Sequence, residues 1–355
     1  MNERIKALCK TLAADEAAFI LSAPNRRYYT AFDSSNGAVL VMKDDALFLT
    51  DFRYIEAANA KADDVPCKES SALFKDAVAI LKDRGIGKLY LENETLTVSE
   101  LHRFKQQADG VVLVADETLC KRIFEQRRVK SEREVALMRR AQALTDDGFS
   151  YILPRLTVGR TEKDVALDLE MYMRRQGADA VAFDFIVASG ENSSMPHAVP
   201  CDRRLQKGDF VTMDFGATVD GYRSDMTRTV AIGEVSDEQK LVYDTVLKAQ
   251  MTCLDGLKAG MTGEEGDRLA RQIIEQAGYG KAFGHSTGHG VGIDVHEKPH
   301  LSPRSQELLR VGEIVTVEPG IYLEGRFGVR IEDMVWLTAD GNIDLTASDK
   351  RLIVL

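Results

Sequence analysis

The dipeptide Asp220-Gly221 is the feature of this 355-residue chain that most restricts its fold. Asp-Gly favours a two-residue hairpin turn, because both central positions of such a turn need positive φ. The runs on either side, 210–219 and 222–232, are rich in Val, Thr and aromatic residues and nearly alternate in polarity. This pattern predicts an antiparallel hairpin whose register is set by the turn.

That hairpin places two acids on one face. In the predicted register Asp214 faces Thr227 and Gly216 faces Asp225, so the two aspartates are diagonal neighbours. Diagonal positions in a sheet lie roughly 7–8 Å apart, a span that two carboxylates can close around metal ions.

A second acid pair and a histidine extend the set. Glu318 ends one strand-like run, Glu332 lies inside the next, and His289 lies within a glycine-rich stretch. A single acid in a strand is usually a solvated charge or an ion-pair partner. These acids have apolar neighbours, however, and burying unpaired carboxylates is costly. Four carboxylates and one imidazole in one pocket require cations, so the set predicts a site for two divalent metals.

The histidines are concentrated in the same part of the chain. Five of the six lie between positions 197 and 300, among densely spaced glycines: His197, His285, His289, His296 and His300. Glycines at this density indicate tight backbone packing beside a bound group, or a flexible loop.

The stretch from His296 to His300 also matches the H-E-x-x-H pattern of zinc proteases. That motif requires a helix to bring both histidines onto one face. Pro299 removes a helix hydrogen bond and disfavours helical geometry at Lys298. An HExxH-type zinc protease is therefore the less favoured alternative.

Five motifs in order carry a family resemblance, and together they span most of the second half of the chain: 183–200, 211–229, 284–299, 315–322 and 330–333. The chain resembles the pita-bread metallopeptidases, in the branch of Xaa-Pro dipeptidases (prolidases) and aminopeptidase P. The fold implied is α+β: a creatinase/prolidase-like mixed α/β N-terminal domain followed by a pseudo-duplicated pita-bread catalytic domain.

The resemblance also implies residue roles. Asp214 would bind the first metal, Asp225 and Glu332 would bridge both, and His289 and Glu318 would bind the second. His197 and His296 match histidines that line the substrate site. His285 and Arg330 match positions that support the metal ligands.

Residues 1–124 read as an α/β domain, 125–133 as a charged linker and 134–355 as the catalytic domain. Within the last, two similar units follow one another, each with two helices and then a strand-rich segment carrying acids. Four helix starts are predicted by capping residues: Ser131 with Glu134, Thr161, Ser236 with Gln239, and Thr262.

Bulk properties exclude other classes of protein. The net charge of −10 gives no electrostatic footprint for nucleic acid, and no run approaches the roughly 20 apolar residues of a membrane span. The cysteines are scattered, odd in number and form no CxxC pair, which favours a reducing cytoplasm: Cys9, Cys67, Cys120, Cys201 and Cys253.

The oxygen-rich ligand set favours Mn²⁺, with Co²⁺, Fe²⁺ and Zn²⁺ as alternatives. Two ions can share a water molecule and lower its pKa, which gives a bridging hydroxide for attack on the carbonyl before proline. Glu318 would move the proton to the leaving nitrogen, and His296 with His197 would stabilise the tetrahedral intermediate. The expected substrates are short proline-containing peptides.

Dipeptidase and aminopeptidase activities are both open. Some prolidases of the family are thought to use an arginine just after the HExP motif to hold the dipeptide carboxylate, and here that position is His300. Arg203, Arg204 and Arg326 are the candidate substitutes. The family also favours a homodimer. The alternative from another class is a peptide-binding member of the fold that has lost turnover.

Overall fold

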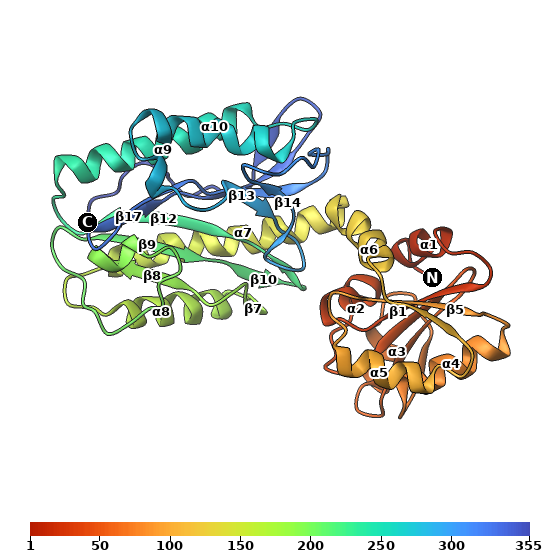
Figure 1. Ribbon diagram of the computed structural model, residues 1–355. Coiled ribbons are helices and arrows are strands. Elements are labelled where there is room, and N and C mark those ends of the chain that lie inside the picture. Colours follow the sequence, from red (N-terminus) through yellow and green to blue (C-terminus); the bar gives the residue numbers. More distant parts are fainter. The chain divides into compact units, whose positions relative to one another are not determined.

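The computed structural model describes residues 1–355, which form two compact units, 1–127 and 128–355 (Figure 1). Unit 1 contains a six-stranded sheet in the order β4-β3-β2-β1-β5-β6. Its strands are β1 (Glu16–Ile20), β2 (Ala38–Met42), β3 (Ala46–Thr50), β4 (Cys67–Glu69), β5 (Lys88–Leu91) and β6 (Val112–Val114). The β1–β2 and β2–β3 pairs are antiparallel, and the other pairs are parallel.

Six helices surround this sheet or lead out of it: α1 (Glu3–Lys10), α2 (Ala23–Thr30), α3 (Ile55–Lys61), α4 (Leu73–Asp83), α5 (Val98–Gln107) and α6 (Thr118–Arg128). The core between the sheet and α4 and α5 is mostly aliphatic and contains three phenylalanines in contact. The rings of Phe74 and Phe104 stack with centroids 4.0 Å apart, and Phe19 of β1 meets both edge-on. The mixed α/β character predicted for this region is thus present.

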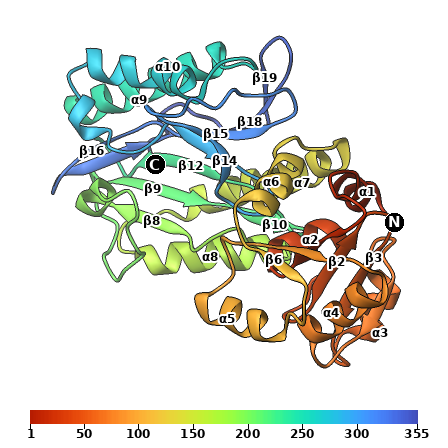
Figure 2. The ribbon, with the colours of Figure 1, turned by 45° about the vertical axis from the view of Figure 1, so that its right-hand side comes forward.

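In unit 2 two helix pairs cover the strands, one in each half of the unit: α7 (Glu132–Ile152) with α8 (Glu162–Arg175), and α9 (Asp237–Gly256) with α10 (Gly263–Gln276). Figures 1 and 2 show α9 and α10 along one side of the strands and α8 along the other. All four helices begin with the predicted cap, and each cap is a full capping box. Short 3-10 turns complete the helical elements: η1 (Leu153–Arg155), η2 (Gly190–Ser194) and η3 (Gly280–Ala282).

The first half of unit 2 is built on the predicted hairpin, whose strands are β9 (Phe210–Phe215), β10 (Ala217–Val219), β11 (Tyr222–Arg223) and β12 (Met226–Ala231). Asp220 and Gly221 have φ of 49° and 79°, as the turn requires. Thr227 lies opposite Asp214, so the predicted register is confirmed. The ladder is interrupted at Gly216, where an added Cβ would collide with the carbonyl of Ser224.

The second half contains a hairpin of the same design: β15 (Ile314–Val317), β16 (Gly320–Leu323), β17 (Phe327–Arg330) and β18 (Asp333–Leu337). Val317 pairs with Asp333, and Gly320 pairs with Arg330, so one register runs through both parts. The interruption between them is where Glu318 and Glu332 lie. Pro319, which has no N–H to give to a ladder, accounts for part of this break.

The remaining strands extend these hairpins into larger sheets: β7 (Ala180–Val181), β8 (Ile186–Ser189), β13 (Gly288–Gly290), β14 (Glu297–Leu301) and β19 (Asn342–Asp344). The sheet orders are β11-β10-β7, β12-β9-β8, β14-β13-β15-β18-β19 and β16-β17. None of the helices combines the length and apolar character needed to cross a membrane.

Strand alternation directs the acids away from the helices. Val211, Met213 and Phe215 pack in the core of the first half, so Asp214 between them points to the opposite face. Val315 and Val317 likewise pack in the core of the second half, next to Glu318. The acids of both halves of unit 2 therefore lie on the strand faces that point away from the helices, and they meet there in one cavity.

Candidate metal centre and active site

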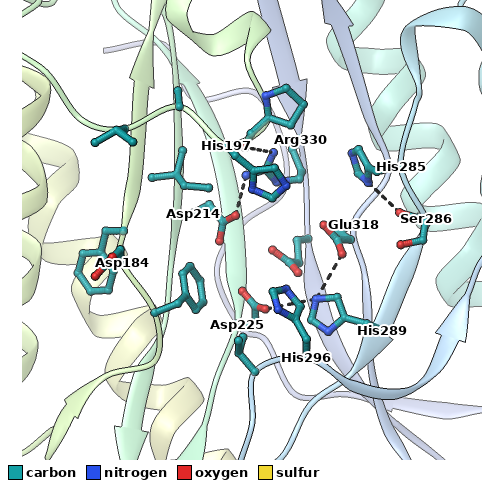
Figure 3. Close-up of a pocket in the computed structure, with 18 of the residues that line it drawn as sticks. Asp184, His197, Asp214, Asp225, His285, Ser286, His289, His296, Glu318 and Arg330 are labelled. Atoms are coloured by element: carbon teal, nitrogen blue, oxygen red, sulfur yellow. Dashed lines mark hydrogen bonds and ion pairs between the residues drawn. The ribbon is translucent and has the colours of Figure 1, made fainter. Parts of the chain in front are cut away.

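One cavity of about 650 Å³ collects the five predicted metal ligands (Figure 3). Asp214 and Asp225 come from the first hairpin, and Glu318 and Glu332 come from the interruption of the second. His289 lies in β13, which pairs with β15 and so brings its imidazole beside Glu318. The structure thus brings together residues that are up to 118 positions apart in the sequence.

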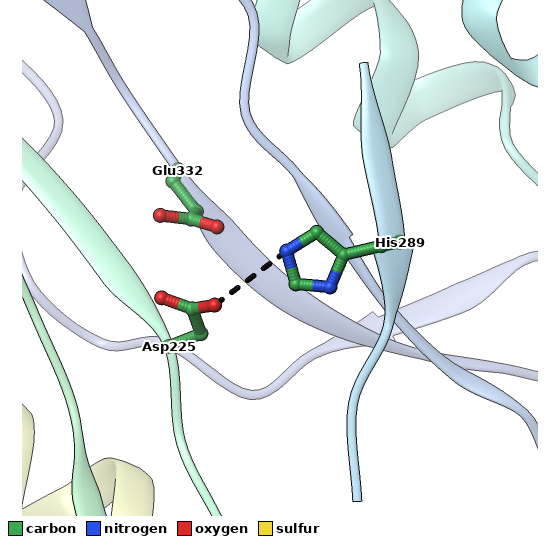
Figure 4. Close-up of side chains that lie close together, drawn as sticks. All are labelled: Asp225, His289 and Glu332. Atoms are coloured by element: carbon green, nitrogen blue, oxygen red, sulfur yellow. Dashed lines mark ion pairs between the residues drawn. The ribbon is translucent and has the colours of Figure 1, made fainter. Parts of the chain in front are cut away.

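The tightest group consists of Asp225, His289 and Glu332, whose ligand atoms all lie within 4.8 Å of one another (Figure 4). His289 Nε2 is 3.7 Å from Asp225 Oδ2 and 3.4 Å from Glu318 Oε1. At these distances the possible metal-ligand atoms surround a common centre, and most of them make no direct hydrogen bond to one another.

The protonation state of His289 fits a metal ligand. Its Nδ1 is 3.0 Å from the carbonyl oxygen of Gly290, which can only accept, so Nδ1 carries the proton. Burial lowers the pKa of His289 to about 3, so the ring is neutral and the lone pair of Nε2 faces the carboxylates. A lone pair aimed at carboxylates is repulsive unless a cation lies between them.

The acids show the same need for a cation. Burial, followed by the charges of Asp214 and Glu318, raises the pKa of Asp225 well above its usual range. Burial and the neighbouring acids raise the pKa of Glu332 in the same way, and burial raises the pKa of Glu318 to about 8. In addition, Asp214 Oδ1 is buried without a hydrogen-bond partner. These observations fit a donor set for divalent cations.

Arg330 is the single guanidinium that lines this cavity. It is buried and donates to Asp214 Oδ2 at 2.6 Å, to the hydroxyls of Tyr322 and Thr227, and to the carbonyl of Pro196. Thr227 in turn donates to Glu332 at 2.7 Å. One cation faces four carboxylates of the ligand set, and this excess of acids contributes to the raised pKa values of Asp225 and Glu332.

Besides His289, four histidines line the cavity: His197, His285, His296 and His300. His285 is held by the hydroxyl of Tyr322, 2.9 Å from Nε2, and burial lowers the pKa of His285 to about 4. The rings of His296 and His289 lie edge to face with centroids 4.5 Å apart. His197 is exposed on the loop after η2, and Figure 3 shows it beside Arg330 and Asp214.

The HExxH alternative is excluded by geometry. His296 precedes strand β14, Glu297 lies in it, and Glu297 is paired with Lys130 at 3.2 Å. His300 pairs across the strands with His289 and also lines the cavity. No helix brings His296 and His300 onto one face, as the proline at position 299 predicted.

The three arginines considered as carboxylate binders all lie outside the cavity lining. Arg203 is paired with Asp209 at 2.6 Å, and Arg204 donates to the carbonyl of Gly159. Arg326 is paired with Glu238. Each is therefore engaged elsewhere in unit 2.

Several lining residues were missed in the sequence. The apolar part of the wall includes Phe183, Phe185, Val199 and Val295. Tyr322, which links His285 to Arg330, was also missed. The pattern of residues 183–186, apolar on both sides of Asp184, was the available signal, but nothing in it indicates which side faces a cavity.

Comparison with known proteins gives the family. A model of metallopeptidase family M24 matches residues 136–339, and a model of the creatinase/prolidase N-terminal domain matches residues 3–127. The chain belongs to metallopeptidase family M24. The predicted combination of a creatinase/prolidase N-terminal domain with a pita-bread catalytic domain is confirmed.

Relatives match over nearly their whole length. The Bacillus subtilis peptidase YqhT is 42% identical over 99% of both chains, and the Xaa-Pro dipeptidase of Pyrococcus horikoshii is 34% identical over 99% of both. The solved structure of an Xaa-Pro dipeptidase from Bacillus anthracis superposes with a TM-score of 0.94 at 41% identity, covering 99% of each chain. An X-Pro aminopeptidase from Thermotoga maritima gives 0.90 at 36%, covering 98% of this chain and 100% of that one.

Proposed function

We propose that this protein is a dinuclear metal exopeptidase that hydrolyses the bond before proline in short peptides. The observation that carries the proposal is the convergence of four carboxylates and one neutral imidazole in one cavity with a single arginine. Relatives that are called Xaa-Pro dipeptidase and X-Pro aminopeptidase support the choice of substrate.

The proposed ligands divide between two ions. Asp214 would hold one ion, His289 and Glu318 the other, and Asp225 with Glu332 would contact both. When bound, such ions lower the pKa of a water molecule and polarise the carbonyl that it attacks. The absence of thiolate ligands favours Mn²⁺ over softer ions.

The residues of the chain supply the proton transfers. Glu318 lines the cavity beside His289, 3.4 Å from its Nε2, and keeps a carboxylate oxygen within reach of the proposed water site. We assign it the role of taking a proton from the attacking water and returning it to the proline nitrogen. His296 and His197 face the same cavity, and their N–H groups would stabilise the developing oxyanion.

His285 and Arg330 would keep the ligands in place. Arg330 holds Asp214 directly, and Tyr322 connects Arg330 with His285. The loss of a group that orients metal ligands in this way typically lowers metal affinity or activity on the order of 10–100-fold.

The apolar wall suits the proline ring. Phe185, Val199 and Val295 offer a surface without charge beside the acids.

All five cysteines are free thiols, which supports a reducing compartment such as the cytoplasm. As in the family it resembles, we infer a homodimer, with residues 1–124 as a separate N-terminal domain, a linker at 125–133 and the catalytic domain at 134–355.

The proposal is tested by an assay with purified protein and Mn²⁺ against the dipeptide Ala-Pro and the tripeptide Ala-Pro-Ala, with a chelator-treated control. Cleavage of the dipeptide alone identifies a dipeptidase, and cleavage of the tripeptide identifies an aminopeptidase. Absence of metal-dependent cleavage of both peptides would contradict the proposed function.

A further inference from the structure

Glu162, the first residue of α8, is a fully buried carboxylate that accepts hydrogen bonds only from neutral donors. Oε1 accepts from the amide and the hydroxyl of Ser189, both at 2.7 Å, and from Asn192 Nδ2 at 3.1 Å. Oε2 accepts from the amide and the thiol of Cys201, both at 3.1 Å. A carboxylate is costly to bury in this way unless all its donors stay in place.

These donors lie at the two ends of one loop. Ser189 ends strand β8, Asn192 lies in η2, and Cys201 follows twelve residues after Ser189. The backbone of α8 adds two bonds at the far end, from the amides of Glu162 and Lys163 to the carbonyls of residues 203 and 201. One side chain thus closes the loop 189–201.

The loop carries part of the cavity wall. Pro196, His197 and Val199 all line the cavity, and His197 lies beside Arg330 and Asp214 (Figure 3). Glu162 itself does not line it. Any influence of Glu162 on the reaction must therefore pass through the loop.

The loop is also held on its opposite side. The amide of Gly328 donates to the hydroxyl of Ser193 at 2.9 Å, and Arg330 Nη1 donates to the carbonyl of Pro196 at 3.3 Å. A Cβ at Gly328 would collide with the carbonyl of Ser193, so β17 and the loop are in close contact. Glu162 fixes the ends of the loop, and β17 fixes its middle.

We propose that Glu162 is a positioning residue: it closes the loop 189–201 and thereby sets the place of His197 in the cavity. The proposal rests on the function proposed for His197, but the closure of the loop can be measured without activity. Nothing in the surroundings of Glu162 gives it contact with substrate or metal.

The test uses Glu162→Gln in the full-length protein, with Glu170→Gln on the exposed face of the same helix as the matched control. Glutamine keeps one carbonyl oxygen for Ser189 but presents an NH₂ group to the N–H donors of Cys201 or Asn192, so one end of the loop is released. Asn192→Ala, which removes a donor and leaves the buried charge in place, is the second variant.

The first readout is amide hydrogen exchange across residues 193–200. We expect it to rise on the order of tenfold in Glu162→Gln and in Asn192→Ala and to stay unchanged in Glu170→Gln, because local opening governs exchange. Unchanged exchange in this segment would overturn the proposal, whatever the protein hydrolyses.

The second readout is a double-mutant cycle with His197→Ala, measured as kcat/KM for the preferred peptide at saturating Mn²⁺. Glu162→Gln should lower kcat/KM on the order of 10²-fold in the native background, as a displaced catalytic group does, and less than about twofold in His197→Ala. Equal losses in both backgrounds would show a merely structural role and contradict the proposal. If the native protein cleaves no proline peptide, the proposed function fails, and the exchange result alone decides the role of Glu162.

Discussion

Glu332 and Asp333 are neighbours in sequence and equally buried, yet their side chains belong to two different charged regions. Glu332 faces the candidate metal centre, where Arg330 is the single cation beside four carboxylates. Asp333 faces a network in which charges balance: Arg228 lies 2.7 Å from Oδ1, and Lys350 lies 2.9 Å from Oδ2.

In the balanced network around Asp333, each acid is paired with a cation. Arg228 also donates to the carbonyls of Thr227, Glu332 and residues 348–349, and Lys350 also pairs with Asp344 at 2.7 Å. Two acids thus meet two cations. What distinguishes the candidate metal centre is therefore the imbalance of charge, because the acids Asp225 and Glu332 are as deeply buried as the pair Arg228 and Asp333. An excess of acids over cations indicates a site for a bound cation. Equal numbers of acids and cations indicate a structural role.

The largest effect is expected on catalysis, when one carboxylate of the candidate metal centre is replaced. Glu332→Gln removes a carboxylate that we place against both ions, so kcat/KM should fall on the order of 10³-fold or more, as expected for the loss of several kcal/mol of transition-state stabilisation. The stability of the chelated protein should not fall, because a neutral amide avoids the cost of burying a carboxylate among other acids. A loss of chelated stability equal to that of Asp333→Asn would contradict the distinction between the two regions.

The next effect is on stability. Asp333→Asn leaves Arg228 buried with a weakened partner, and breaking a buried pair costs roughly 3–5 kcal/mol. Urea unfolding of the chelated protein should show this loss, while the metal affinity of the remaining folded protein should stay within a few-fold of the native value. A stability change below about 1 kcal/mol would mean that the network contributes little.

Metal binding should stabilise the folded protein, because the bound ions neutralise the excess of carboxylates in the candidate metal centre. At a Mn²⁺ concentration about 100 times the dissociation constant, binding to the folded state alone adds about 2.7 kcal/mol per site. The shift of the unfolding midpoint on adding Mn²⁺ should be strongly reduced in Asp225→Asn and retained in Asp333→Asn. Equal shifts in both variants would place the ions elsewhere.

The smallest effect is a pH dependence of the metal-free protein. Because the pKa of Glu318 is raised in the folded state to about 8, the folded protein holds a proton that the unfolded chain releases near pH 4.5. Stability should therefore fall as pH rises between about 4.5 and 8, by at most about 1.4 kcal/mol per pH unit for one proton. Glu318→Gln should flatten this slope, and a stability that instead rises across this window would be inconsistent with uncompensated acids.

The sequence predicted those parts of the fold that depend on local rules. The turn at Asp220-Gly221 set the register of the first hairpin, the capping residues gave four helix starts, and Pro299 excluded a helix at His296. These features follow from backbone preferences over a few residues.

The rest required the folded chain. Arg228 and Asp333 are 105 positions apart, and Lys350 follows later still, so no local pattern shows that one acid of the pair 332–333 is neutralised and the other is not. The closure of the loop at Glu162 is equally invisible, because Glu162 reads as an ordinary acid in the first turn of a helix.

The most direct test of the account is the number of Mn²⁺ ions bound per chain, measured by titration of the chelated protein followed by elemental analysis. The account predicts two ions in the native protein and in Asp333→Asn, and fewer than two in Asp225→Asn and Glu332→Gln. One ion or none in the native protein, or two ions in all four proteins, would contradict it.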